Sequence, residues 1–211
     1  MDATQHAISF LLDRSGSMAV IRAETLAAVN SYITEMKDRP APGLTFTLTL
    51  FDSAGIDVVH RAVPIGDVPL LTEKDFVPRA ATPLIDALAM TILEASTQYA
   101  PTDRVVIVAM TDGKENASRE FTLVQLRELI AKHHAWDFIF LGAAIDAYQE
   151  AGAFGIGHGA TMSYRANDMR ASIAAYSAVA GRAKRYMETG ERREFSRAEK
   201  RAAGDEFDPS A

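Results

Sequence analysis

The chain has 211 residues, 48% of them hydrophobic, which is enough to bury the core of one α/β domain with a short appendage. It contains no cysteine, which excludes disulfides and thiolate metal sites and is expected of a protein in a reducing compartment. A formal net charge of -6 argues against broad nucleic-acid binding, because such binding depends on many Lys and Arg side chains.

The first residues predict neither a signal peptide nor a membrane anchor. They have no basic start, and Asp13 interrupts the first apolar run too early for a signal peptide. No segment approaches the roughly 18 consecutive apolar residues of a membrane span. We therefore expect a cytoplasmic protein that does not contact a membrane.

Three oxygen-bearing side chains, Asp13, Ser15 and Ser17, follow directly after the apolar segment 8–12. The apolar segment predicts a buried strand, and ligands of open α/β sheets bind at the carboxyl ends of strands. Alternate residues project to one side and Gly16 lets the backbone curl, so the three side chains can converge. One carboxylate and two hydroxyls suit Mg²⁺ or Mn²⁺, and distant residues must complete the site. The alternative interpretation is ordinary helix capping.

The next elements alternate between helix and strand patterns. Residues 20–38 carry one apolar helical stripe, and residues 45–50 alternate as a strand with one buried face. Residues 56–63 follow after a short turn and predict an antiparallel hairpin partner. A long loop over 64–81 then leads to Thr82.

Thr82 precedes a predicted helix over 83–99, in which Pro83 takes the favoured first helical position. The alternative interpretation of Thr82 is an ordinary cap of this helix. The run 105–110 is the most continuously apolar segment and predicts a strand buried on both faces in the middle of the sheet. Asp112 follows this strand, so a second carboxylate is expected at a carboxyl strand end.

The rest of the domain predicts a three-layer, doubly wound α/β fold. From residue 190 the composition changes to mixed charge, with Phe195 and Phe207 as anchors, so we expect a domain over 1–189 and a flexible or weakly docked tail over 190–211. The remaining predicted elements are a helix over 121–132, a strand over 136–141, a short helix within 142–159, a strand over 160–164 and a helix from Asn167 or Asp168 to Met187.

Three motifs in this order resemble the von Willebrand factor type A (vWA) domain family, and the resemblance covers most of the chain. The motifs are Asp13-x-Ser15-x-Ser17, then Thr82-Pro83-Leu84, then Thr111-Asp112-Gly113. The resemblance is to an intracellular member of bacterial or phage type. It implies a mostly parallel sheet with one antiparallel edge strand.

The resemblance also implies a metal-ion-dependent adhesion site for Mg²⁺ or Mn²⁺. Ser15, Ser17 and Thr82 would touch the metal, and Asp13 and Asp112 would hold it largely through water. The family often has glycines just before the threonine, where this chain has Ala80 and Ala81. In the family, ligand binding can couple rearrangement of the metal loops to movement of the last helix, here about 168–188, which we state as a hypothesis.

A dication bound directly by neutral hydroxyls keeps much of its charge and an open coordination position, so it attracts a carboxylate from another molecule. The predicted function is a metal-dependent protein-binding module, not an enzyme, whose protein partner supplies an Asp or Glu. One alternative is a metal-dependent hydrolase or phosphotransferase at the same loop, although neither Gly-x-Ser-x-Gly nor a P-loop is present. Another is a scaffold subunit in a multi-subunit or ATPase-associated assembly, because intracellular members of the family often work in complexes or beside ATPases.

Three basic residues, Arg14, Arg79 and Lys114, each lie within three positions of a proposed metal-site residue. Either they form a positive rim that steers an acidic partner segment toward the metal, or they are three independent solvated charges.

Overall fold

One sheet with the strand order β3-β2-β1-β4-β5-β6 forms the centre of the computed structural model, which describes residues 4–143 and 146–206. Neighbouring strands are parallel except β2 and β3, which pair antiparallel at one edge. This confirms the predicted sheet and its antiparallel edge strand. The strands are β1 (His6–Asp13), β2 (Thr45–Asp52), β3 (Gly55–Pro64), β4 (Arg104–Thr111), β5 (Asp137–Ala143) and β6 (Thr161–Tyr164).

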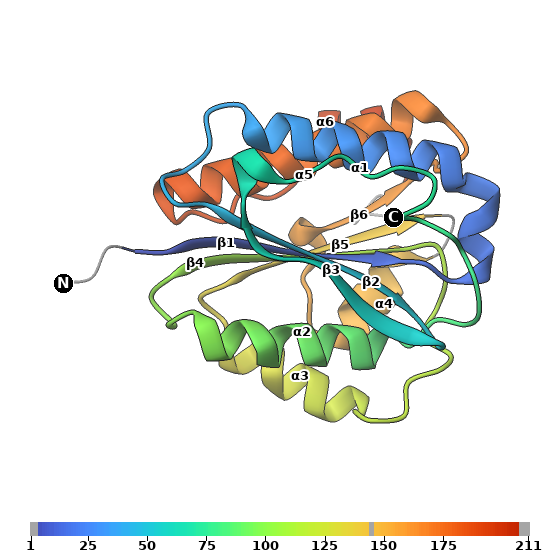
Figure 1. Ribbon diagram of the computed structural model, residues 1–211, viewed down its shortest axis with the longest axis horizontal. Coiled ribbons are helices and arrows are strands. Elements are labelled where there is room, and N and C mark those ends of the chain that lie inside the picture. Colours follow the sequence, from blue (N-terminus) through green and yellow to red (C-terminus); the bar gives the residue numbers. More distant parts are fainter. Residues whose placement is uncertain (1–3, 144–145, 207–211) are drawn as a thin grey trace.

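Helices cover both faces of the sheet, so the predicted three-layer architecture is confirmed (Figure 1). One face carries α1 (Arg22–Lys37) and α5 (Met169–Thr189), and the other carries α2 (Leu84–Gln98), α3 (Leu123–Lys132) and α4 (Ala147–Phe154). The short elements are η1 (Gly16–Ile21), η2 (Ile65–Asp67), η3 (His158–Ala160) and α6 (Arg197–Ala202).

Strand β1 contributes side chains to both layers of the core because successive residues of a strand point to opposite faces. Phe10 packs in the cluster under α1 and α5, and Leu11 packs in the cluster under α2 and α3. Strand β4 is likewise buried on both faces, as its unbroken apolar sequence predicts. The two strands lie side by side with Leu12 opposite Met110, so their carboxyl ends meet at the middle of the sheet.

Helix α2 begins one residue later than the sequence predicts. Pro83 has φ -87° and ψ 64°, which is not helical, and the first helical residue is Leu84. Thr82 therefore lies two residues before the first helical residue, and the alternative interpretation that it caps α2 is wrong. By contrast, Asp168 caps α5 by accepting hydrogen bonds from the amides of Arg170 and Ala171, as expected.

Residues 190–206, the described part of the predicted tail, contact the domain at several points. Phe195 is buried, and the Arg165 amide donates a hydrogen bond to the Ala203 carbonyl. The Asp205 carboxylate accepts hydrogen bonds from the Tyr148 hydroxyl and a backbone amide of β6. Phe207, the second expected anchor, lies outside the described residues, and the boundary between domain and tail stays a prediction.

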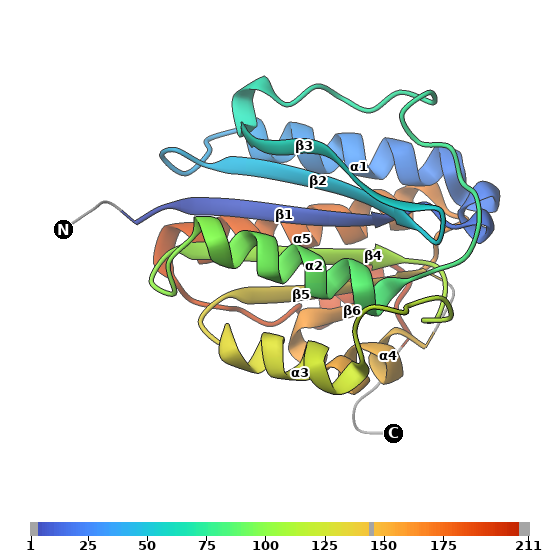
Figure 2. The ribbon, with the colours of Figure 1, turned by 60° about the horizontal axis from the view of Figure 1, so that its bottom comes forward.

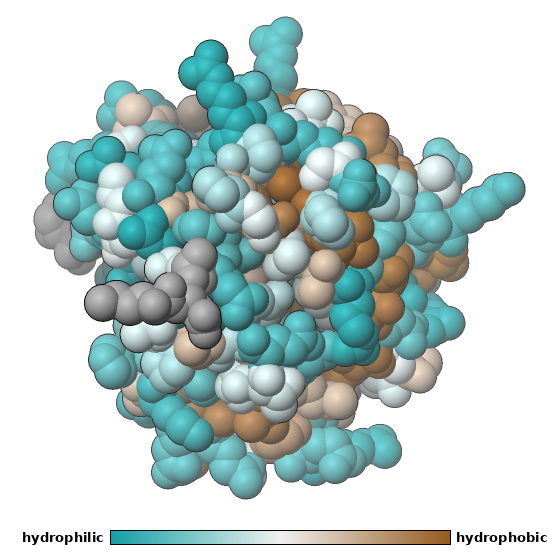
Figure 3. Space-filling view, turned by 60° about the vertical axis from the view of Figure 1, so that its left-hand side comes forward, coloured by the Kyte–Doolittle hydropathy of each residue, from teal (hydrophilic) through white to brown (hydrophobic). Residues whose placement is uncertain are grey.

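Polar side chains dominate the surface face that Figure 3 shows, with apolar side chains exposed between them. Within 4–143 and 146–206, none of the helices combines the length and the apolar character needed to cross a bilayer. Even α5, with 21 residues, carries several Arg and Lys side chains.

Candidate metal-binding site

The three sequence motifs meet at the carboxyl ends of β1 and β4, on the right of Figure 2. Asp13 is the last residue of β1, and Asp112 directly follows β4. The two strands are parallel neighbours, so both loops leave the sheet at its carboxyl end, the end where the parallel strands finish. Backbone hydrogen bonds bring the loop that precedes α2 to the same edge, since the Gly16 amide donates to the Ala80 carbonyl at 3.0 Å.

Four of the five predicted ligands form a continuous chain of hydrogen bonds. Asp13 Oδ1 accepts from the Ser15 amide at 2.6 Å. The Ser15 and Ser17 hydroxyl oxygens lie 3.1 Å apart, and Ser17 Oγ donates to Asp112 Oδ1 at 2.7 Å. The structure therefore brings together side chains that are 95 residues apart in the sequence.

Thr82, the fifth predicted ligand, lies beside the same chain of hydrogen bonds. A β-carbon added to Gly113 would lie 3.1 Å from Thr82 Oγ1 and 3.9 Å from Ser17 Oγ. Because Gly113 has no side chain, there is space next to both hydroxyls. Asp13, Ser15 and Thr82 are buried and Ser17 is exposed, so the group is open to solvent on one side.

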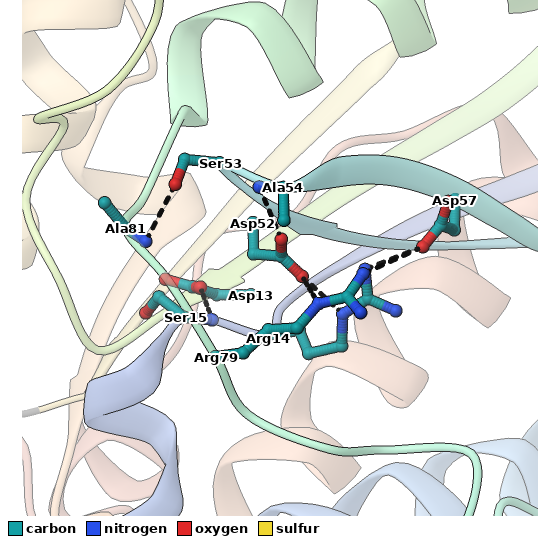
Figure 4. A network of polar contacts seen from close by, with 9 residues as sticks. All are labelled: Asp13, Arg14, Ser15, Asp52, Ser53, Ala54, Asp57, Arg79 and Ala81. Carbon is teal, nitrogen blue, oxygen red and sulfur yellow. Dashed lines mark hydrogen bonds and ion pairs between the residues drawn. The ribbon is translucent and has the colours of Figure 1, made fainter.

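Neighbouring loops hold the backbone around Thr82 from two sides. On one side, its amide donates to Asn116 Oδ1 at 2.9 Å, and the Asn116 amide donates to the Thr82 carbonyl at 3.1 Å. On the other side, Ser53 exchanges two hydrogen bonds with Ala81, one through its hydroxyl at 3.1 Å and one through its amide at 2.8 Å. Figure 4 shows the bond between the Ser53 hydroxyl and the Ala81 amide.

Burial makes both carboxylates of the site difficult to ionise. It raises the pKa of Asp13 to about 6, although the hydrogen bonds from Thr111 and Ser15 act in the opposite direction. Burial also raises the pKa of Asp112, against the hydrogen bond from Ser17. Two desolvated carboxylates side by side would be stabilised by a cation.

The donor set fits a hard dication with few direct negative charges. Three hydroxyls and two carboxylates are oxygen ligands of the kind that Mg²⁺ and Mn²⁺ take. In the described part of the chain no group of three or more His, Asp and Glu side chains could hold a metal ion. The candidate site is therefore a mixed hydroxyl and carboxylate set, not an acidic cluster.

The three predicted rim residues lie in different environments. Arg14 is buried, and its Nε and Nη2 lie 2.6 Å from Asp52 and 2.7 Å from Asp57 (Figure 4). Arg79 is half exposed and pairs with the same two aspartates at 3.1 and 3.7 Å. Lys114 is exposed. Two of the three rim charges thus face negative partners, and a positive rim stays a prediction.

Sequence reasoning missed three residues that support the site. Thr111 donates a hydrogen bond of 2.5 Å to Asp13 Oδ2, Asn116 holds Thr82, and Asp52 binds the two arginines. A signal for Asp52 was present, because it ends the apolar strand β2 as Asp13 ends β1. Thr111 was part of the third motif but was given no role, and Asn116 carried no such signal, since their roles depend on which loops become neighbours.

No protein-family model and no curated protein sequence matches the chain. Solved structures do. A von Willebrand factor type A protein from Catenulispora acidiphila matches with a TM-score of 0.60 and 16% identity, over 86% of this chain and 43% of that one. The vWF domain of the type V pili tip protein Mfa5 from Porphyromonas gingivalis matches with a TM-score of 0.65 and 10% identity, over 90% of this chain and 99% of that one. The chain has a vWA-like fold.

A third vWA-like match is the manganese-loaded TRAP protein of Plasmodium vivax, with a TM-score of 0.54 and 16% identity, over 80% of this chain and 72% of that one. The chain spans less than half the length of the Catenulispora protein. At these identities the likeness shows the fold alone.

Proposed function

We propose that this vWA-like chain is a divalent-metal-dependent protein-binding module. The observation that carries the proposal is the convergence of Asp13, Ser15, Ser17, Thr82 and Asp112 at one edge of the sheet. In this proposal Ser15, Ser17 and Thr82 hold Mg²⁺ or Mn²⁺ directly, and Asp13 and Asp112 hold it largely through water.

The bound metal would supply positive charge and an open coordination position for a carboxylate of a partner protein. The chain's own residues favour this role because the direct ligands are neutral hydroxyls, which leave the charge of the metal largely uncompensated. Ser17 lies on the exposed side of the group, where a partner's Asp or Glu has access.

The comparisons support a binding role in general terms. The TRAP protein is described as manganese-loaded, and Mfa5 is described as a pili tip protein. We propose that the interaction partner is a protein, in a multi-subunit or ATPase-associated assembly, and that the chain acts in the cytoplasm.

A two-step experiment tests the metal site and then the partner. Calorimetric titration with Mn²⁺ and Mg²⁺ should detect one site in the wild type, and Ser17→Ala should abolish it. Ser96→Ala is the matched control, because the Ser96 hydroxyl bonds a carbonyl of its own helix α2. A Ser17→Ala protein that still binds the metal with wild-type affinity would contradict the proposed ligand set.

The second step is affinity capture from a lysate of the source organism, with wild type and Ser17→Ala in Mg²⁺ and in chelator. A partner should be retained only by the wild type with Mg²⁺. If its acidic residues are changed one at a time to Ala, one change should release it. Retention that is indifferent to chelator would contradict a metal-dependent contact.

A hydrolase or phosphotransferase at the same loop has less support. Ser15 Oγ and Ser17 Oγ bond each other and acidic side chains, and within the described residues neither bonds a histidine that could act as a base. Turnover of generic phosphoesters that Ser15→Ala abolishes would favour the enzyme over the binding module.

A further inference from the structure

A single buried carboxylate connects the two loops that carry Ser15 and Thr82. Asp52 is the last residue of β2, and its side chain is fully buried. Its Oδ2 accepts hydrogen bonds from Arg14 Nε at 2.6 Å and from Arg79 Nε at 3.1 Å. Figure 4 shows both guanidinium groups gathered around this carboxylate.

The two arginines belong to the two different loops that carry proposed metal ligands. Arg14 lies between Asp13 and Ser15, and Arg79 lies three residues before Thr82. The backbones of the same loops are joined as well, because the Arg79 amide donates to the Arg14 carbonyl at 2.8 Å. Asp52 thus completes a closed connection between the two parts of the site.

The Thr82 loop needs such a restraint because part of its backbone is strained. Ala80 has φ 60°, a left-handed conformation that residues with a β-carbon rarely adopt. Strained backbone persists only where surrounding contacts hold it in place. The contacts here are the bonds of Arg79 to Asp52 and of the Ala80 carbonyl to the Gly16 amide.

We propose that Asp52 is a positioning residue of the metal site. Through Arg14 and Arg79, its carboxylate sets the separation between the Ser15 and Thr82 hydroxyls. The ion pairs compensate the buried charge of Asp52, since the hydrogen bonds from Arg14 and the Ala54 amide hold its pKa below the usual value although burial acts to raise it. The proposal rests on the metal site of the proposed function, but its central measurement does not need the metal.

Two variants separate positioning from simple charge effects. Asp52→Asn removes a negative charge near the site, and Arg79→Gln removes a positive one. If Asp52 acts only through its charge, Asp52→Asn weakens Mn²⁺ binding and Arg79→Gln strengthens it. If it positions the loops, both variants weaken Mn²⁺ binding, by about tenfold for Asp52→Asn, the low end of the effect of removing a residue that orients a metal site from outside its ligands.

Matched controls exist for both variants. Asp137, at the start of β5, forms a buried pair with Arg182 remote from the site, so Asp137→Asn tests the general effect of breaking a buried ion pair. Arg61 on β3 pairs with Glu94 and is slightly more exposed than Arg79, so Arg61→Gln tests the loss of one exposed arginine. Neither control should change the Mn²⁺ dissociation constant by more than about twofold.

Hydrogen exchange of the metal-free proteins gives the decisive measurement. The amides of Gly16 and Arg79 bond across the two loops, and Asp52→Asn and Arg79→Gln should each lower their protection at least tenfold, while amides in β4 stay protected. Unchanged protection of both amides in Arg79→Gln, which removes a half-exposed side chain, would overturn the positioning role.

The two proposals fail in distinguishable ways. A wild type that binds no metal, together with lowered protection in the variants, would refute the metal site and leave Asp52 as the residue that joins the loops. A wild type that binds metal, together with a higher Mn²⁺ affinity in Arg79→Gln, would overturn positioning and leave the metal site intact.

Discussion

The hydroxyl of Ser17 donates a 2.7 Å hydrogen bond to the carboxylate of Asp112, although the two residues are 95 positions apart. The contact exists because β1 and β4 are adjacent parallel strands, so the loops that follow them leave the same edge of the sheet. It joins the first and the last of the three motifs. The structure leads to four predictions, two at this end of the sheet and two elsewhere in the chain.

Replacing Asp13 with Asn should stabilise the metal-free protein at neutral pH. Burial raises the pKa of Asp13 from 3.8 to about 6, so its contribution to stability is present below pH 3.8 and is lost as the pH rises through 6. The free energy of unfolding that is lost in this way between pH 4 and pH 7.5 is about 2–3 kcal/mol at most. Asn keeps the acceptor for the Ser15 amide, and the Thr111 hydroxyl can turn to the Gly113 carbonyl at 3.0 Å.

Urea unfolding of wild type and Asp13→Asn in chelator measures this effect. The variant should be more stable at pH 7.5 and equal to the wild type at pH 4, and it should no longer be stabilised by Mn²⁺. An equal difference at both pH values would contradict the raised pKa as its cause.

Adding a methyl group at Gly113 should weaken metal binding more than folding. Its β-carbon would lie 3.1 Å from Thr82 Oγ1, so one of the two has to move by a few tenths of an ångström. We expect Gly113→Ala to lower Mn²⁺ affinity at least tenfold and the free energy of unfolding by about 1 kcal/mol. Gly66→Ala is the control, because its β-carbon would meet nothing within 4 Å. Wild-type Mn²⁺ affinity in Gly113→Ala would place Thr82 outside the site.

The buried pair of Arg182 and Asp137 should be a strong determinant of stability. Arg182 Nε and Nη2 donate to the two carboxylate oxygens of Asp137 at 2.9 and 2.7 Å, and both side chains are buried. Asp137→Asn leaves the guanidinium charge without its counterion, which should cost about 3 kcal/mol in urea unfolding. Glu191→Gln, which breaks the exposed pair with Arg185, should cost less than about 1 kcal/mol. Equal costs would mean that burial does not strengthen the first pair.

Acid should release α6 before the rest of the domain unfolds. The hydrogen bond from Arg193 lowers the pKa of Glu199 from 4.5 to about 2, against the effect of burial. Because the folded pKa is lowered, the contribution of Glu199 is present above pH 4.5 and is lost as the pH falls toward 2. Protection of the Ala203 amide, which bonds the Glu199 carbonyl, should fall over this range relative to β4. In Glu199→Gln this protection should already be low at pH 6, and an unchanged value would exclude the ion pair as its cause.

Local patterns in the sequence were sufficient for most elements. The apolar run of β4 predicted a strand buried on both faces, and Asn167 or Asp168 was predicted to cap the last helix, which Asp168 does in α5. These features depend on neighbours within a few residues, where side-chain periodicity and backbone hydrogen bonding decide the structure. The start of α2 was misjudged because the conformation of Pro83 depends on how the loop before it is held.

The candidate ligands were found from the sequence because each lies at a strand end or in a motif that resembles a known family. Their convergence needed the strand order, which places β1 beside β4. The partners of Arg14 were decided by tertiary structure alone, since Asp52 and Asp57 lie 38 and 43 residues away. The physical reason is that hydrophobic periodicity is a local property of the chain, whereas the partner of a charge is set by whichever loop the folded sheet brings within about 4 Å.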